Sequence, residues 1–272
     1  LAAVLVSLLG TLGAMLSLYS MTRSSLGDEG GVRAAFYLLI FPSGFFLAQV
    51  YTEGLFIGLT FGSLAFMMTR KRYLSALLAA LAVWARPGGA MLLIPLAMVW
   101  FIDKTWQKGW KVALGHGLVV LSPLISYGIW SLTSMADKFH LVEESFFGRG
   151  FFALGPSAAA WGQAVQSLFQ NNLQTKFYYG LEFAVTLLAV LACILLLKEF
   201  PELSLYGLLM IVFAFTSGSA QGMVRYVLVV PALFWMLARW GRNSAFDRVW
   251  SLLSILLMGL EVLLFSFDFW VA

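Results

Sequence analysis

The sequence is poor in charged residues, and it has one cysteine and two histidines. Charged residues make up 11% of its 272 positions, and hydrophobic residues make up 61%, against roughly 45–50% in a soluble domain. This composition excludes a water-soluble globular protein. Cys193 lies in an apolar run and has no second cysteine to pair with, so cysteine usage indicates no compartment. His116 and His140 have no partner at metal-ligand spacing, and we expect neither a metal nor a cofactor.

Several sequence motifs are also missing. The chain contains no GxGxxG, no P-loop and no nucleophile elbow, which argues against nucleotide-dependent chemistry. The basic clusters RKR and KTWQKGWK are explained most simply as topology signals, and we expect no nucleic-acid partner.

What the chain has in abundance is apolar segments. They predict an all-α, polytopic transmembrane helix bundle of about ten spans, folded as a single domain over residues 1–272. Several segments fall short of the roughly 20 residues that cross a bilayer, and Pro and Gly interrupt them in FPSG and RPGG. Broken helices at membrane depth line cavities. The expected spans are residues 1–20, 34–48, 51–68, 73–85, 89–102, 112–130, 177–197, 203–217, 224–239 and 248–268.

Charge is distributed unequally between the connections. Alternating the spans places five basic connections on one face, and they hold 12 of the 17 Lys and Arg residues. The positive-inside rule makes that face cytoplasmic. The other face carries the long connection 131–176, and long connections tend to be functional. We therefore expect an integral multi-pass protein, in the plasma membrane of a prokaryote rather than the endoplasmic reticulum because the other connections are compact.

The non-cytoplasmic face has its own charged residues. Glu53 begins one segment, Arg86 ends another, Arg149 lies in FFGRGFFALGP, and Arg225 opens RYVLVVPALFWML. A charge at the bilayer centre costs about 2.5–3.5 kcal/mol, and such residues commonly pair or line pathways. Guanidinium groups bind phosphate oxygens bidentately and keep their charge when partly desolvated. The pattern predicts a phosphate clamp, with neighbouring aromatic rings against a sugar or an isoprenoid chain.

Each of these residues also has a simpler structural explanation. The three arginines could extend to lipid headgroups. Glu53 could complement the N-terminus of a helix that starts near Thr52. Glu182 is interpreted as an interface residue near a span end, and Glu261, deeper in its segment, as the partner of a neighbouring helix.

Four blocks together resemble a known family. FPSGFFLAQVYTEGLF, LAVWARPGGAMLLIP, FFGRGFFALGP and SGSAQGMVRYVLVVPALF follow one another between about residues 30 and 240. Their order and spacing resemble the PIG-V-like mannosyltransferases, relatives of the second GPI mannosyltransferase. Two details depart from that family. ARPGG stands where TRPNG is more usual, and Glu143, Glu144 and Phe147 stand where the family tends to carry Gln and Trp.

The resemblance implies a glycosyltransferase of the GT-C type. Such an enzyme moves a hexose, here mannose, from a polyprenyl- or dolichyl-phosphate sugar to a glycan or lipid acceptor on the non-cytoplasmic side, with inversion and without a metal. The family's proposed base lies in a Trp-Asp motif that does not occur here, so we expect an N-terminal part with the base to precede Leu1. The roles implied for this chain are catalysis by Glu53 and Arg225, and substrate binding by Arg86, Arg149, Tyr51 and Tyr226.

Two other functions fit the pattern. A lipid-linked substrate transporter or flippase also has broken helices and intramembrane charges, but it should show pseudo-symmetric halves and charges near the middle of the membrane. A non-catalytic subunit of a membrane complex would need no base of its own.

Overall fold

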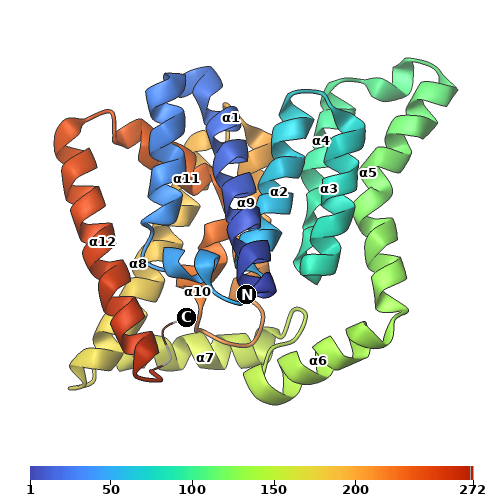
Figure 1. The fold of residues 1–272 in the computed structure, drawn as a ribbon. Helices are drawn as coiled ribbons and strands as arrows, with labels where there is room; N and C mark the ends of the chain where they lie inside the picture. The colour runs from blue at the N-terminus through green and yellow to red at the C-terminus, as the bar shows by residue number, and fades with distance from the viewer. Residues whose placement is uncertain (270, 272) are drawn as a thin grey trace.

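A computed structural model describes residues 1–269 and 271, and every regular element in them is a helix (Figure 1). The predicted all-α fold is therefore confirmed. The α-helices are α1 (Ala2–Leu39), α2 (Glu53–Met68), α3 (Arg72–Ala85), α4 (Leu93–Ile102), α5 (Trp110–Ser131), α6 (Ser134–Phe147), α7 (Leu154–Ser167), α8 (Leu173–Leu196), α9 (Pro201–Phe215), α10 (Met223–Tyr226), α11 (Pro231–Trp240) and α12 (Ser244–Ser266). Short 3₁₀ turns are η1 (Gly44–Ala48), η2 (Pro87–Leu92), η3 (Thr105–Gln107) and η4 (Val227–Val229).

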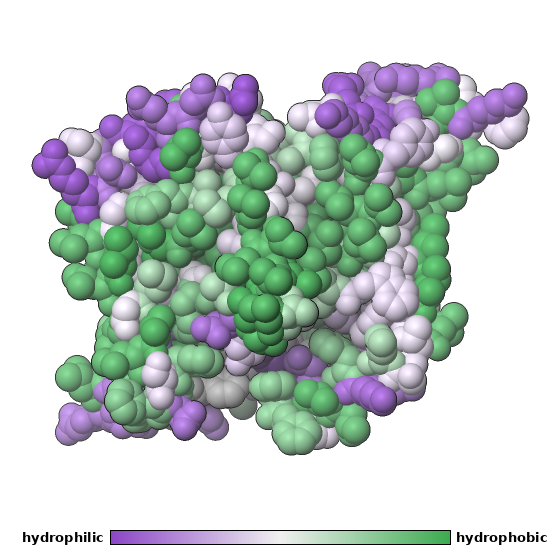
Figure 2. All heavy atoms as spheres, in the orientation of Figure 1, coloured by the Kyte–Doolittle hydropathy of each residue, from purple (hydrophilic) through white to green (hydrophobic). Residues whose placement is uncertain are grey.

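The helices define two ends of the molecule. In Figure 1, α6 and α7 lie across the lower end, which also carries both chain termini, and we call it the α6–α7 end. The upper end carries the turn of α1 and the connections α2–α3, α4–α5 and α11–α12, and we call it the basic end. Hydrophilic side chains gather at the basic end, above a broad apolar belt (Figure 2). The predicted segregation of the basic connections is thus visible in the fold.

Helix α1 is a hairpin of two arms. At Gly27 the backbone leaves the helical region (φ 76°, ψ 177°), a conformation that glycine adopts without steric cost. Tyr19 Oη donates a hydrogen bond to Asp28 Oδ1 at 2.7 Å, and a Cβ on Gly31 would lie 2.6 Å from the Tyr19 ring. A straight helix would separate residues 19 and 31 by about 18 Å. The first predicted span and the start of the second are therefore antiparallel neighbours.

Helix length limits the number of membrane spans. Four helices, α1, α5, α8 and α12, are long and apolar enough to cross a membrane, or up to five if the bent pair Met223–Val229 and Pro231–Trp240 forms one span. The 16 residues of α2 reach only about 24 Å, against a hydrocarbon core of roughly 30 Å. These helices support an integral multi-pass membrane protein. The count of ten spans stays a prediction.

Glycine packing fixes the start of α2 against α1. A Cβ on Gly58 would overlap the backbone oxygen of Gly10, and a Cβ on Gly10 would lie 2.5 Å from the backbone of Gly54. Small residues four positions apart let two helix backbones approach closely in a membrane. The sequence EGLFIG therefore sets how closely the N-terminus of α2 lies against α1.

The long connection 131–176 is helical. It contains α6 and α7, which lie across the end of the bundle instead of running along it (Figure 1). Their exposed side chains include large apolar ones, such as Phe146, Leu141 and Leu154. Amphipathic helices with exposed apolar residues lie in the interface of a membrane.

Candidate functional site

Glu53 is the first residue of α2, and its side chain is 1% exposed. Contacts with α1 hold the segment before it. Ser7 Oγ donates to the carbonyl of Tyr51 at 3.0 Å, and Thr11 Oγ1 donates to the carbonyl of Leu47 at 2.8 Å. The position of the buried carboxylate is therefore determined by α1 together with α2.

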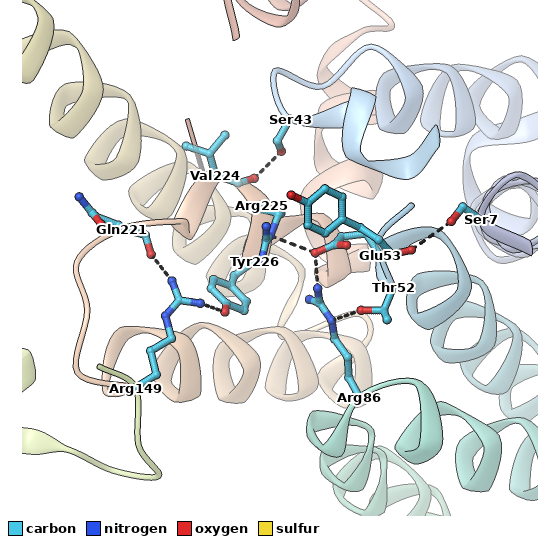
Figure 3. A network of polar contacts seen from close by, with 11 residues as sticks. Ser7, Ser43, Thr52, Glu53, Arg86, Arg149, Gln221, Val224, Arg225 and Tyr226 are labelled. Atoms are coloured by element: carbon cyan, nitrogen blue, oxygen red, sulfur yellow. Dashed lines mark hydrogen bonds and ion pairs between the residues drawn. The ribbon is translucent and has the colours of Figure 1, made fainter. Parts of the chain in front are cut away.

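Two arginines share the same carboxylate oxygen. The Arg86 guanidinium donates to Glu53 Oε1, and Arg225 Nε lies 2.9 Å from that oxygen (Figure 3). Arg86 Nε also donates to Thr52 Oγ1 at 2.7 Å. Glu53 stands in the first turn of α2, where an acid complements the helix dipole, but it also pairs with two cations. Helix capping alone does not describe its environment.

A buried carboxylate holds the turn that carries Arg225. Glu182 in α8 is fully buried and accepts the backbone N–H groups of Gly222 at 2.7 Å and Val224 at 3.0 Å. Gly222 has φ 86°, a conformation that disfavours side chains, and Ser43 Oγ donates to the carbonyl of Val224 at 2.6 Å. The interpretation of Glu182 as an interface residue is therefore wrong, because all of its acceptor oxygens face the interior.

Arg149 reaches the same turn from the connection between α6 and α7. It donates to Tyr226 Oη and, at 2.8 Å, to the carbonyl of Gln221. The N–H of Gly150 donates to the carbonyl of Ser217 at 2.7 Å, so backbone contacts also hold this connection. Burial lowers the pKa of Arg149, and the nearby charge of Glu143 opposes that shift.

Aromatic rings surround the Arg225 guanidinium. Its Cζ lies 5.3 Å from the ring centre of Phe46, 5.5 Å from that of Tyr51 and 6.0 Å from that of Tyr226. Such cation–π contacts contribute about 0.5–2 kcal/mol each and orient the cation. The two tyrosines predicted to bind substrate therefore contact Arg225 directly.

Several guanidinium donors in this cluster are unused. The terminal nitrogens of Arg225 and Arg86 Nη1 make no hydrogen bond to any described residue, and the two side chains are 17% and 22% exposed. Arg149 Nε is a buried donor without a hydrogen-bond partner among the described residues. Unpaired buried donors are costly, and an oxyanion with several acceptor oxygens would satisfy them.

The structure brings together all six predicted site residues (Figure 3). The three arginines turn toward protein groups, so extension to lipid headgroups does not describe them. Sequence reasoning missed the contributions of Ser43, Thr52 and Gln221. Ser43 and Thr52 had a detectable signal, as small polar residues inside apolar stretches, whereas Gln221 acts through its backbone and had none.

Two other predicted features lie outside the cluster. Glu261 in α12 is 2% exposed and makes no ion pair with any residue of 1–269 or 271, so its predicted pairing with a neighbouring helix stays a prediction. No group of three or more His, Cys, Asp or Glu in those residues could hold a metal ion.

Comparisons with protein-family models, with curated proteins and with solved structures found no match to this chain. The resemblance noted in the sequence therefore stays a prediction, and the site's geometry carries the functional argument.

Proposed function

We propose that this protein is a membrane glycosyltransferase of the GT-C type. It would move a hexose, with mannose as the first candidate, from a polyprenyl- or dolichyl-phosphate sugar to a glycan or lipid acceptor at the α6–α7 end. The observation that carries the proposal is the convergence of Arg86, Arg149 and Arg225 around Glu53, with guanidinium donors left over. A lipid-phosphate sugar has a phosphate oxyanion that such donors bind. Its isoprenoid chain would lie in the membrane.

In the proposed reaction, the acceptor hydroxyl oxygen attacks the anomeric carbon while the bond from that carbon to the phosphate oxygen breaks. The bonding electrons stay on the lipid phosphate, and the hydroxyl proton passes to a carboxylate. Arg225 and Arg149 stabilise the negative charge that grows on the phosphate, because their positions are fixed in advance. Glu53 orients Arg86 and Arg225, since Oε1 contacts both. The resemblance assigns the proton to an acid in a Trp-Asp motif, and residues 1–272 contain no such motif.

The proposal includes a topology. The bundle would pass through the membrane about ten times, with its basic end cytoplasmic and α6 and α7 on the non-cytoplasmic side of a prokaryotic plasma membrane. Supporting it are the 12 Lys and Arg residues in the connections of the basic end. Short helices such as α2 would cross only where the bilayer is thinned around them.

A lipid-linked substrate transporter is the second candidate. The 86° bend between Met223–Val229 and Pro231–Trp240 favours it, because transporter sites often lie at broken helices. The charged cluster lies at one end of the bundle, however, and a transporter site lies near the middle. We therefore rank the transferase first.

An assay of transfer separates these candidates. Proteoliposomes containing the protein would be supplied with radiolabelled polyprenyl-phosphate mannose and an acceptor lipid extract. We expect Arg225→Ala to lower label transfer at least about 100-fold, as the loss of one oxyanion donor does in other enzymes, with the amount of folded protein unchanged. Arg242→Ala, at the basic end, is the matched control. Equal losses of transfer and of folded protein in Arg225→Ala would contradict the catalytic role, and label that crosses the bilayer without transfer would favour the transporter.

A further inference from the structure

We propose a second anion site, at the basic end, that binds a phosphate group at the membrane surface. It is independent of the function proposed above. A cavity of about 470 Å³ lies where the α2–α3 connection meets the start of α5. This volume falls within the roughly 300–1,000 Å³ of ligand pockets. Its lining includes four cationic side chains, those of Arg70, Lys71, Arg72 and Lys108.

The cationic charge in this cavity is only partly neutralised. Asp103 accepts from Arg72 Nη2 at 2.6 Å and from Arg70 Nη1 at 3.2 Å, and it is the one acid that an ion pair joins to the cavity in the described part of the chain. Lys71 and Lys108 make no ion pair with a residue of that part. Four cationic groups and one carboxylate leave a net positive charge, which a bound anion would neutralise.

His116 adds a hydrogen-bond donor. Arg72 Nη1 lies 2.5 Å from His116 Nδ1. Because a guanidinium can only donate, Nδ1 must accept, and a neutral imidazole then carries its proton on Nε2. His116 also lines a smaller cavity of about 20 Å³ together with Arg72 and Trp100, and the buried Nε1–H of Trp100 has no acceptor among the described residues. The N–H of His116 thus supplements the cations that line the larger cavity, whereas Trp100 lines only the smaller one.

The surroundings place this cavity at headgroup depth. Tyr73 lines the cavity, and Trp106 and Trp110 lie two positions on either side of Lys108; these three side chains are 72%, 42% and 73% exposed. Exposed Trp and Tyr at the ends of apolar helices are typical of a membrane–water interface. A phosphate there comes either from an anionic lipid headgroup or from the aqueous phase. The role of these cations as topology signals depends on their number only and does not explain why four of them line one cavity, whereas binding of an anion does.

Calorimetric titration of the purified protein in an uncharged detergent tests the site. One arm uses inorganic phosphate, a second uses dihexanoyl phosphatidic acid, and a third uses dihexanoyl phosphatidylcholine as the zwitterionic comparison. Binding in both of the first two arms would assign the site to phosphate from either source. Binding of the phosphatidic acid alone would assign it to a lipid headgroup, and binding of phosphate alone to the aqueous phase. Absence of binding in both arms, or equal binding of phosphatidylcholine, would overturn the proposal.

Two matched variants locate the binding. Lys108→Gln removes a cavity cation that makes no ion pair, and Lys198→Gln removes an exposed charge from the α8–α9 connection. We expect Lys108→Gln to weaken binding about tenfold, because a charge-assisted hydrogen bond is lost, and Lys198→Gln to change it less than twofold. Both variants should match the parent protein in melting temperature without ligand, since both side chains are exposed. Equal weakening by the two variants would indicate general surface attraction and would overturn the cavity site.

Discussion

The two ends of the bundle both pair arginine with carboxylates, but in opposite environments. At the basic end, Arg239 and Glu199 form a bidentate pair with side chains that are 27% and 46% exposed. At the α6–α7 end, Glu53 is 1% exposed and forms ion pairs with both Arg86 and Arg225. Solvent offers alternative hydrogen-bond partners to the exposed Arg239–Glu199 pair, but few to the buried group around Glu53.

This difference separates two uses of charge in one membrane protein. Exposed ion pairs contribute about 0–1 kcal/mol, so the charges of the basic end add little to stability. In the topology and the anion site proposed above, these charges orient the protein and bind a phosphate group. Buried charges cost several kcal/mol each unless they are paired, so the cluster around Glu53 persists only with a compensating arrangement. A buried cluster with unused donors is the better candidate for chemistry.

The sharpest test of this comparison removes one carboxylate from each end. We expect Glu53→Ala to lower the free energy of unfolding by about 3–5 kcal/mol, because two guanidinium groups lose their buried partner. Glu199→Ala is the matched control and should cost no more than about 1 kcal/mol. Chemical denaturation of both variants in detergent measures the difference. Similar losses in the two variants would remove the distinction between the ends.

The next largest effect is expected at Glu182, the carboxylate that holds the turn carrying Arg225. Glu182→Ala leaves the N–H groups of Gly222 and Val224 without their acceptor, at about 1–3 kcal/mol for each. We expect faster hydrogen exchange over residues 217–226 than in the parent protein. Glu144→Ala, on an exposed position of α6, is the control. Unchanged exchange in Glu182→Ala would show that other contacts hold the turn.

The packing of α2 against α1, next to the buried cluster, can be perturbed without changing a charged residue. Gly58→Ala would press a methyl group against the backbone of Gly10 and is expected to cost about 1–3 kcal/mol. Gly259→Ala in α12 meets no atom within 4 Å and should be neutral or stabilising, because alanine favours helix. Melting temperatures in detergent compare the two. A neutral Gly58→Ala would mean that α1 and α2 can separate without strain.

The smallest expected effect is a pH dependence at the basic end. The hydrogen bonds from Arg239 lower the pKa of the Glu199 carboxyl below its usual 4.5. A carboxyl whose folded pKa is lowered stabilises the protein above its unfolded pKa, and this contribution disappears as the pH falls through the folded value. The stability difference between the parent protein and Glu199→Gln should therefore be present at neutral pH, begin to fall near pH 4.5 and vanish at lower pH. Unfolding at several pH values measures it, and a difference that grows in acid would contradict the assignment.

Much of the fold could be predicted from local pattern. Each predicted apolar segment corresponds to a helix or a helix pair, because hydropathy over a window of residues reports helical membrane segments directly. The reversal of the chain between the first two predicted spans was expected, but the helical arms on either side of Gly27 and the two helices within 131–176 were not, since hydropathy does not report helices that lie outside the apolar segments. The site residues were predicted from their type, because charged residues are costly in an apolar environment.

By itself, the sequence determined the class of the protein, the positions of its helices and the unequal charge of its two ends, because hydropathy and charge are properties of local segments. Only the tertiary structure decided that Arg86 meets Glu53 across 33 positions, and that Ser43 binds the turn of Arg225 across 181. Such contacts depend on how closely helices approach and in which register they pack. Glu182 shows this most clearly, since nothing around it in the sequence distinguishes a carboxylate at the membrane surface from one that holds a buried turn.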